Sequence, residues 1–164
     1  MRVRRAGPAD AAAIAEIHVG AWRAGYRGLL PDAVLDGLSV GVRRRAWEER
    51  LAGADAPPTL VAEHEGAVAG FCALEPGGGE VAALYVDPGR WGSGAGAALL
   101  GAGLELLREH GAKEAVVWLL AGNERARRLY RRFGFAADGG EKRERIASLS
   151  AEEAPPQVRL RAPL

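Results

Sequence analysis

Four glycines, at positions 89, 92, 94 and 96, lie in the stretch VDPGRWGSGAGAALL, which begins at Val86. Between Gly89 and Leu100 the chain has no Lys, Asp, Glu, His or Cys, so no side chain there is an obvious acid, base or nucleophile. The first N–H groups of a helix have no partner within it, and the helix dipole adds positive potential at the same end. Glycines let the backbone approach a phosphate closely. A strand, this turn and a helix therefore predict a phosphate site made of backbone N–H groups.

The glycine spacing does not match the two best-known phosphate motifs. The dinucleotide fingerprint G-x-G-x-x-G is one residue longer than Gly92–Gly96, and no acidic residue ends a strand about 20 positions later. The P-loop requires a lysine, which is absent here. Alone, the glycines also fit a tight strand-to-helix turn without a ligand.

A second pattern lies downstream, in the stretch NERARRLYRRFGF. Asn123, Ala126 and Tyr130 are spaced i, i+3 and i+7, so they share one face of a helix that ends near Gly134. Three arginines of this helix are expected mostly to face elsewhere, namely Arg128, Arg131 and Arg132. Taken singly, Asn123 fits a helix N-cap and Tyr130 fits a core aromatic residue.

Together the two patterns resemble the GNAT superfamily of acyl-CoA-dependent N-acetyltransferases. Its central motif is a strand ending in V-x-P, then Q/R-x-x-G-x-G/A and a helix, which LYVDPGRWGSGAGAALL matches with Trp91 at the Q/R position. Its second motif, N-x-x-A-x-x-x-Y-x-x-x-G-F, is complete from Asn123 to Phe135. The resemblance covers about residues 1–140.

The resemblance implies acetyl-CoA as the acyl donor, with no metal. Backbone N–H groups would hold the pyrophosphate at Trp91, Gly92, Ser93, Gly94, Ala95, Gly96 and Ala97. The strand end Leu84, Tyr85 and Val86 would pair with the pantetheine arm, and Asn123 would hydrogen-bond to it. Tyr130 would lie near the sulfur and donate a proton to the leaving thiolate. The strand's N–H groups would stabilise the oxyanion.

The acceptor in such a reaction is a primary amine, which must lose a proton before it attacks. A lysine-like amine has a pKa of about 10.4, so deprotonation at pH 7 costs about 4–5 kcal/mol. Glu80, at the start of the strand before the glycines, is the candidate base, although a solvated strand-edge carboxylate fits equally. His18 and His110 are weaker candidates. Trp22 and Tyr26 would line the acceptor pocket or pack in the core.

The remaining composition limits the protein class. With 22 Lys and Arg against 21 Asp and Glu, the net charge of +1 gives no nucleic-acid signature. Cys72, the only cysteine, lies in an apolar run and is expected to be buried. No His, Cys or carboxylate cluster has metal-ligand spacing, and no apolar run approaches a membrane span. The N-terminus lacks the apolar segment of a signal peptide, so a cytoplasmic protein is expected.

Charge is nevertheless uneven along the chain. Between Arg50 and Arg90 there is no Lys or Arg, and the acids are Asp55, Glu63, Glu65, Glu75, Glu80 and Asp87. This segment weakly favours a cationic small molecule as the acceptor, and the arginine-rich helix favours an anionic ligand. Solvated surfaces would produce the same charge pattern.

The elements that must position these residues alternate between strand and helix patterns. The expected order is a strand, helical segments with residues 29–53 forming one continuing element, three strands with a hairpin at EGA, a helix, a buried strand covered on both faces, and a helix. Two weaker strands follow at 135–143 and 155–164. We therefore expect one domain over 1–164 of mixed α/β class, with a mostly antiparallel, GNAT-like sheet of about six or seven strands and helices on both faces.

Two other functions remain open from the sequence. A non-catalytic acyl-CoA-binding sensor would bind the donor without releasing thiol, and a nucleic-acid module would use the arginine-rich helix. Within the enzyme class, the acceptor is a small molecule, a peptide N-terminus or a lysine. The resemblance also allows a homodimer.

Overall fold

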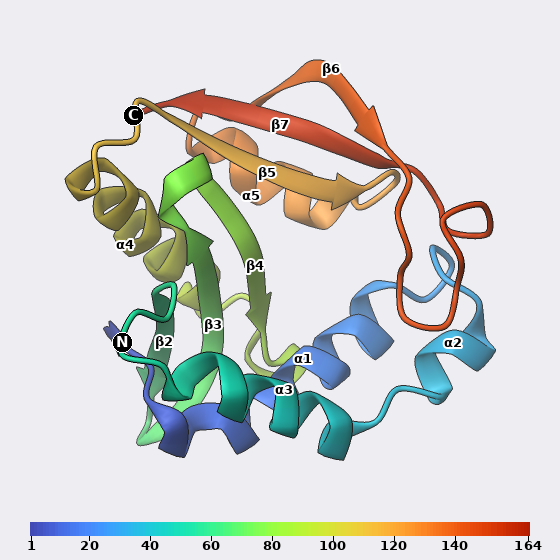
Figure 1. Cartoon of the computed structure of the whole chain (residues 1–164), viewed down its shortest axis with the longest axis horizontal. Helices are drawn as coiled ribbons and strands as arrows, with labels where there is room; N and C mark the ends of the chain where they lie inside the picture. The colour runs from blue at the N-terminus through green and yellow to red at the C-terminus, as the bar shows by residue number, and fades with distance from the viewer.

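The computed structural model describes residues 1–164 and contains one seven-stranded sheet, ordered β1-β2-β3-β4-β5-β7-β6 (Figure 1). The strands are β1 (Arg2–Arg5), β2 (Thr59–His64), β3 (Ala67–Glu75), β4 (Glu80–Val86), β5 (Glu114–Leu120), β6 (Ala136–Lys142) and β7 (Gln157–Pro163). Every neighbouring pair is antiparallel except β4 and β5. The expected mixed α/β class and mostly antiparallel sheet are confirmed.

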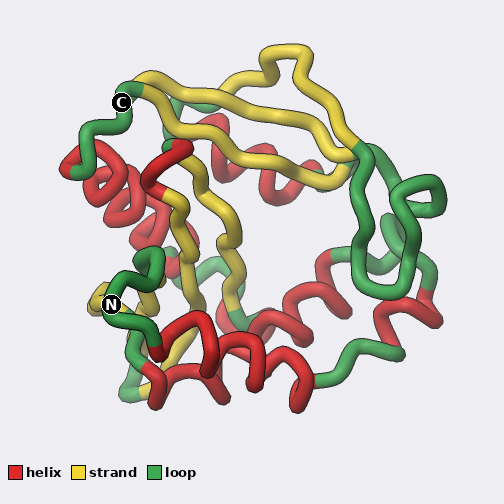
Figure 2. Tube along the Cα trace, viewed as in Figure 1, coloured by secondary structure: helices red, strands yellow, loops and turns green.

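Helices cover both faces of the sheet (Figure 2). They are α1 (Ala11–Gly25), α2 (Asp32–Asp36), α3 (Val40–Ala52), α4 (Ala95–Glu109) and α5 (Glu124–Arg132). Short 3-10 turns precede α1, β4 and the glycine stretch, at η1 (Pro8–Asp10), η2 (Pro76–Gly78) and η3 (Pro88–Arg90). The leucines of α4 and Tyr130 of α5 share one core cluster, whereas α1 and Trp47 of α3 pack in another against Phe71.

The helical region after α1 differs from the prediction of one continuing element. It is broken at Gly37–Ser39 into the short α2 and the longer α3. The side chain of Ser39 accepts a hydrogen bond from the N–H of Val42 at 3.2 Å and caps a new helix. Ser39 has the extended backbone geometry that is typical of an N-cap residue, so it separates two helices instead of joining them.

β5 is also less buried than the continuous apolar pattern suggests. Its burial alternates, with Ala115 and Val117 buried and Val116 and Trp118 half-exposed. The ammonium of Lys142 lies 4.5 Å from the centre of the Trp118 ring. One face of β5 therefore packs in the core, and the other is covered only in part.

The C-terminal segment completes the sheet in an order that the chain order does not suggest. β7 pairs with β5, and β6 lies outside it at the edge. The connection between them packs Ile146 and Ala154 against Leu35 of α2 (Figure 1). No helix has the length and apolar character that a membrane crossing would require.

The feature that positions the site is the divergence of β4 from β5. The two parallel strands share a single register pair, Glu80 with Val116, and beyond it they separate (Figure 1). On its other side β4 pairs with β3, where a register shift between Ala73 and Leu74 leaves Ala82 opposite no β3 residue. Such a bulge takes backbone groups out of the ladder.

Candidate active site

A cavity of about 680 Å³ occupies the space between the diverging strands. Residues 81–86 of β4 line one wall, and residues 117–119 of β5 line the other. The glycine turn and α5 complete the lining, with Gly25 and Tyr26 from the end of α1. The structure therefore brings the two sequence motifs to opposite sides of one cleft.

The glycine turn has the geometry of an open helix N-terminus. Gly92 and Gly94 have φ values of 83° and 90°, which L side chains rarely adopt, and Gly94 is the N-cap of α4. No heavy atom lies within 4 Å of where a Cβ would be on either residue. Gly96 is different, because a Cβ there would come within 3.3 Å of the Leu129 side chain. The turn is open, and the helix behind it packs closely on α5.

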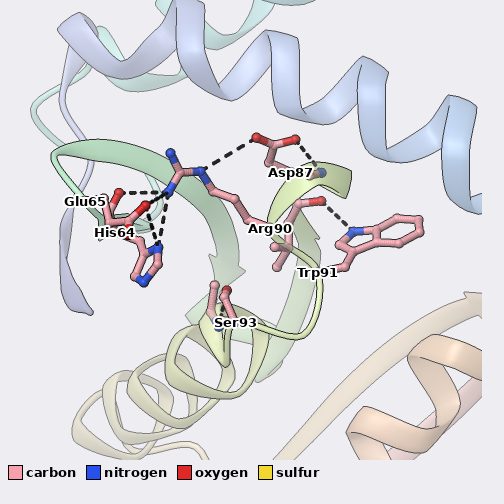
Figure 3. A network of polar contacts seen from close by, with 9 residues as sticks. His64, Glu65, Asp87, Arg90, Trp91 and Ser93 are labelled. Atoms are coloured by element: carbon pink, nitrogen blue, oxygen red, sulfur yellow. Dashed lines mark hydrogen bonds and ion pairs between the residues drawn. The ribbon is translucent and has the colours of Figure 1, made fainter.

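Arg90 and Trp91 point to opposite sides of this turn (Figure 3). The Arg90 guanidinium donates to the His64 carbonyl at 2.9 Å and contacts the His64 ring. The Trp91 indole Nε1 donates to the Val86 carbonyl at 3.0 Å. Arg90 is therefore held against the β2–β3 hairpin, and Trp91 lies across the end of β4 beside the cleft.

The Asn123 side chain does what its sequence position suggested for a cap. Its Oδ1 accepts a hydrogen bond from the N–H of Ala126 at 3.2 Å, at the start of α5. The residue also lines the cleft. Because the oxygen is used by the helix, the two N–H donors of the amide remain for a ligand.

Tyr130 lies on the same face of α5 as Asn123. It lines the cleft and is only 3% exposed. Its ring packs edge-on against Phe135, with centroids 5.2 Å apart. Burial raises the pKa of the Tyr130 hydroxyl well above its usual value. The phenol is therefore protonated at neutral pH, the form in which it donates a hydrogen bond or a proton.

The charged residues that line the cleft are all arginines, namely Arg90, Arg125, Arg128 and Arg132. The prediction that the arginines of α5 mostly face elsewhere is wrong for Arg128 and Arg132. Long side chains extend well beyond the helix face on which their Cα atoms lie, so they reach the cleft rim. No Asp or Glu lines the cleft.

Acidic side chains in the segment between Arg50 and Arg90 bond to other parts of the protein. Glu63 bonds to Arg4 at 2.7 Å, Glu75 bonds to Arg50 at 2.9 Å, and Asp87 accepts from the N–H of Gly89. No carboxylate of this segment lines the cleft, so the segment gives no support there to a cationic acceptor. These three carboxylates bond at strand ends and at the turn before α4.

The end of the cleft next to α1 is aromatic and neutral. The hydroxyls of Tyr26 and Tyr85 lie 3.1 Å apart, and both residues line the cleft. Trp22 packs on both rings without lining the cleft, and its buried indole N–H has no hydrogen-bond partner. His18 stacks on Tyr85 and accepts from the Trp47 indole at 3.1 Å. Burial lowers the pKa of His18 to about 3, so its imidazole is neutral at pH 7.

The other candidate residues lie apart from the cleft. Glu80 is half-exposed at its closed end and is not among the lining residues. His110 is at the end of α4, where its ring contacts the Leu106 carbonyl. Cys72 is fully buried, as expected, and burial raises the pKa of its thiol to about 12. No group of three or more His, Cys, Asp or Glu side chains is arranged to hold a metal.

Three features of the site were not predicted from the sequence. The first is Arg125, which precedes Ala126 in the second motif, because nothing local distinguishes it from the other arginines. The second is the bulge at Ala82, because it depends on how β3 and β4 pair. The third is the cleft wall formed by residues 117–119, because it depends on the order of the strands in the sheet.

Residues 14–135 match the model of the acetyltransferase (GNAT) family. The chain is 35% identical over 130 residues to the uncharacterized N-acetyltransferase YuaI of Bacillus subtilis, covering 74% of this chain and 72% of that protein. It is 38% identical over 97 residues to the mycothiol acetyltransferase of Acidimicrobium ferrooxidans, covering 55% of this chain but only 31% of that protein.

Solved structures share the fold. A GCN5-related N-acetyltransferase from Rhodopseudomonas palustris superposes with a TM-score of 0.81 at 23% identity, covering 99% of this chain and 95% of that one. YncA of Salmonella typhimurium, solved with its cofactor acetyl-CoA, gives 0.70 at 23% identity, with 100% and 94% covered.

Proposed function

Because the chain belongs to the acetyltransferase (GNAT) family, we propose that it is an N-acetyltransferase that transfers an acetyl group from acetyl-CoA to a primary amine. The observation that carries this proposal is the cleft between β4 and β5. The glycine turn lies on one side of it, and Asn123 and Tyr130 lie on the other. A structural neighbour with this fold was solved with acetyl-CoA.

The residues present fit the donor. The space where a Cβ of Gly92 or Gly94 would lie is open, and all charged groups on the cleft lining are positive. A pyrophosphate bound there would accept hydrogen bonds from the N–H groups of residues 91–97. The pantetheine arm would lie along Leu84–Val86. The Asn123 amide would donate to it from the opposite wall.

The proposed chemistry is a direct attack of the amine nitrogen on the thioester carbonyl carbon. The new C–N bond forms as the carbonyl π electrons move to oxygen, and the C–S bond breaks when the tetrahedral intermediate collapses. Backbone N–H groups of β4 beside the Ala82 bulge would stabilise the oxyanion. Tyr130, held protonated by burial, would donate a proton to the departing thiolate sulfur. The proton that the attacking nitrogen loses as the intermediate collapses to the amide would return to the Tyr130 oxygen through water.

The proton that the ammonium loses before attack needs an acceptor. Glu80 remains the proposed base, and its place outside the cleft lining means that water would have to carry the proton to it. The tyrosine pair Tyr26 and Tyr85 provides the polar atoms nearest the acceptor end. Their hydroxyls would orient the amine by hydrogen bonds.

The acceptor end suggests a class of amine. With no carboxylate on the lining, a polycation would lose hydration without gaining a counter-ion. We therefore propose an acceptor with one reactive primary amine next to an apolar or aromatic group, on a small molecule or at a peptide end. The aromatic rings of Tyr26 and Tyr85 would contact the apolar part.

A turnover screen tests the proposal. Purified protein is incubated with acetyl-CoA and single representatives of amine classes, and free thiol is measured. Thiol release that depends on both substrates, with N-acetyl product found by mass spectrometry, supports the proposal. Acetyl-CoA binding by calorimetry without thiol release for any amine would favour the non-catalytic sensor instead. Absence of binding would reject the donor site.

A further inference from the structure

The side chain at the Q/R position of the family motif differs in this protein. The motif position that usually holds Gln or Arg is occupied by Trp91, and the adjacent Arg90 is bonded to His64 on the β2–β3 hairpin (Figure 3). Trp91 carries no charge, and the Arg90 guanidinium is already bonded to His64. Among the arginines that line the cleft, Arg125 of α5 contacts Trp91 directly.

The Arg125 guanidinium lies over the face of this tryptophan. Its central carbon is 3.2 Å from the centre of the Trp91 ring. The ring itself is held by the bond from its Nε1 to the Val86 carbonyl at 3.0 Å. This bond orients the Trp91 ring, which is 38% exposed, and both residues line the cleft.

Arg125 has no anionic partner in the protein. It forms none of the ion pairs or side-chain hydrogen bonds, whereas its neighbour Arg127 pairs with Glu124 at 3.5 Å. Partial burial and the nearby positive charge of Arg128 lower the pKa of Arg125, which agrees with a cation that nothing neutralises. An arginine remains protonated at neutral pH all the same.

Stacking leaves the edge of a guanidinium free. The ring contacts the flat face, so the N–H groups in the plane can still donate, in the paired geometry that suits phosphate oxygens. Stacking also restricts a flexible side chain before the ligand arrives, which reduces the entropy lost on binding.

We propose that Trp91 and Arg125 act as one unit that binds the pyrophosphate of the donor, with Arg125 making the contact and Trp91 positioning it. In this protein the cation comes from α5, because Trp91 occupies the motif position on the turn. The inference rests on the proposed function, because acetyl-CoA must bind here for it to apply. It makes Arg125 a binding residue and Trp91 a positioning residue.

Calorimetry with four variants tests the proposal. The variants are Arg125→Ala, Trp91→Ala, the double variant, and Arg131→Ala as the control, since Arg131 is on the same helix but does not line the cleft. We expect Arg125→Ala to raise the Kd of acetyl-CoA about 10- to 100-fold, the effect of losing a charged hydrogen-bond donor. Arg131→Ala should leave the Kd unchanged.

The double variant separates positioning from packing. If Trp91 acts through Arg125, the double variant binds acetyl-CoA no more weakly than Arg125→Ala does, because the two effects are not additive. Additive losses would overturn the claim that the pair is a unit. Circular dichroism and thermal midpoints show that each variant is folded.

Donor analogues identify the phosphate. Acetyl-dephospho-CoA keeps the pyrophosphate and should lose affinity with Arg125→Ala as acetyl-CoA does, whereas S-acetylpantetheine, which lacks all phosphates, should bind wild type and variant equally. A loss seen only with acetyl-CoA would assign Arg125 to the 3′-phosphate and overturn the proposal. If wild type binds acetyl-CoA and Arg125→Ala binds it equally well, only this inference fails. If wild type does not bind it, the proposed function fails.

Discussion

Glu80 and Val116 form the single register pair between β4 and β5, and the residues that follow each of them line the cleft. Parallel neighbours in a sheet normally continue their ladder, so one pair followed by separation leaves unpaired backbone groups on both strands. Unpaired N–H and C=O groups that line a cavity need partners from water or a ligand. An extended amide-containing arm, such as pantetheine, would provide them.

The Tyr130 hydroxyl is predicted to act in the chemical step. Its ring packs on Phe135 and its hydroxyl makes no hydrogen bond within the protein, so Tyr130→Phe should fold normally. We expect kcat to fall on the order of 100-fold with little change in the Kd of acetyl-CoA, because a general acid acts mainly in the transition state. Steady-state kinetics and calorimetry check this.

The pH dependence of kcat provides a second test of the role of Tyr130. Because burial raises the pKa of Tyr130, the wild-type enzyme keeps its proton donor through neutral pH and loses it only at alkaline pH. The variant should lack that alkaline decrease. Superimposable profiles with equal kcat would remove Tyr130 from the chemistry.

Gly94 is predicted to be needed for its backbone conformation. Its φ of 90° is strained for any L side chain, while the space around a Cβ is empty. Gly94→Ala should therefore destabilise the fold by about 1 kcal/mol and weaken acetyl-CoA binding on the order of 10-fold, as the turn relaxes. Urea unfolding and calorimetry measure both effects.

Gly77 provides the matched control for this experiment. It too has open space where a Cβ would lie, its φ is outside the left-handed region, and it does not line the cleft. Gly77→Ala should change neither measurement by much. Equal binding by the Gly94 and Gly77 variants would contradict the assignment of the turn as the phosphate site.

Glu80 is predicted to accept the amine proton through water. Glu80→Gln should lower the rate at neutral pH and shift the activity toward higher pH, where more of the amine is already uncharged. The Kd of acetyl-CoA should not change, because Glu80 does not line the cleft. A pH–rate profile identical to that of wild type would contradict this role of Glu80, because the amine would then lose its proton to solvent alone.

His18 is predicted to make stability sensitive to acid. Burial lowers its pKa to about 3, against an ordinary value of 6.5, so between these values the unfolded chain binds a proton that the folded protein does not. Stability is therefore fully present above about pH 6.5 and decreases as the pH falls toward 3. The loss attributable to His18 should reach about 2 kcal/mol by pH 5.

Urea unfolding at pH 7 and pH 5 tests this prediction. His18→Gln loses part of the contact with the Trp47 indole at both pH values, so the informative quantity is the difference between them. That difference should shrink by about 2 kcal/mol relative to wild type. His110→Gln, at the exposed end of α4, should leave it unchanged, and an equal effect of both variants would reject the role of His18.

The local patterns of the chain were sufficient for most elements and for placing both sequence motifs on their elements. The glycine turn, the helix after it and the face shared by Asn123 and Tyr130 depend on interactions within a few residues, which spacing reports directly. The resemblance to the acetyltransferase family rested on these stretches, and the family is confirmed. The break at Ser39 was missed because a capping serine and a serine within a helix look alike without their hydrogen bonds.

Tertiary structure alone decided how these pieces meet. Spacing tells which face of an element a residue occupies, but the neighbour of that face depends on pairings between distant segments, such as β7 between β5 and β6. For the same reason the sequence did not show that no carboxylate of the acidic segment lines the cleft or that Arg125 lies over the Trp91 ring. A side chain's partner is set by long-range packing, and so is the substrate that it can bind.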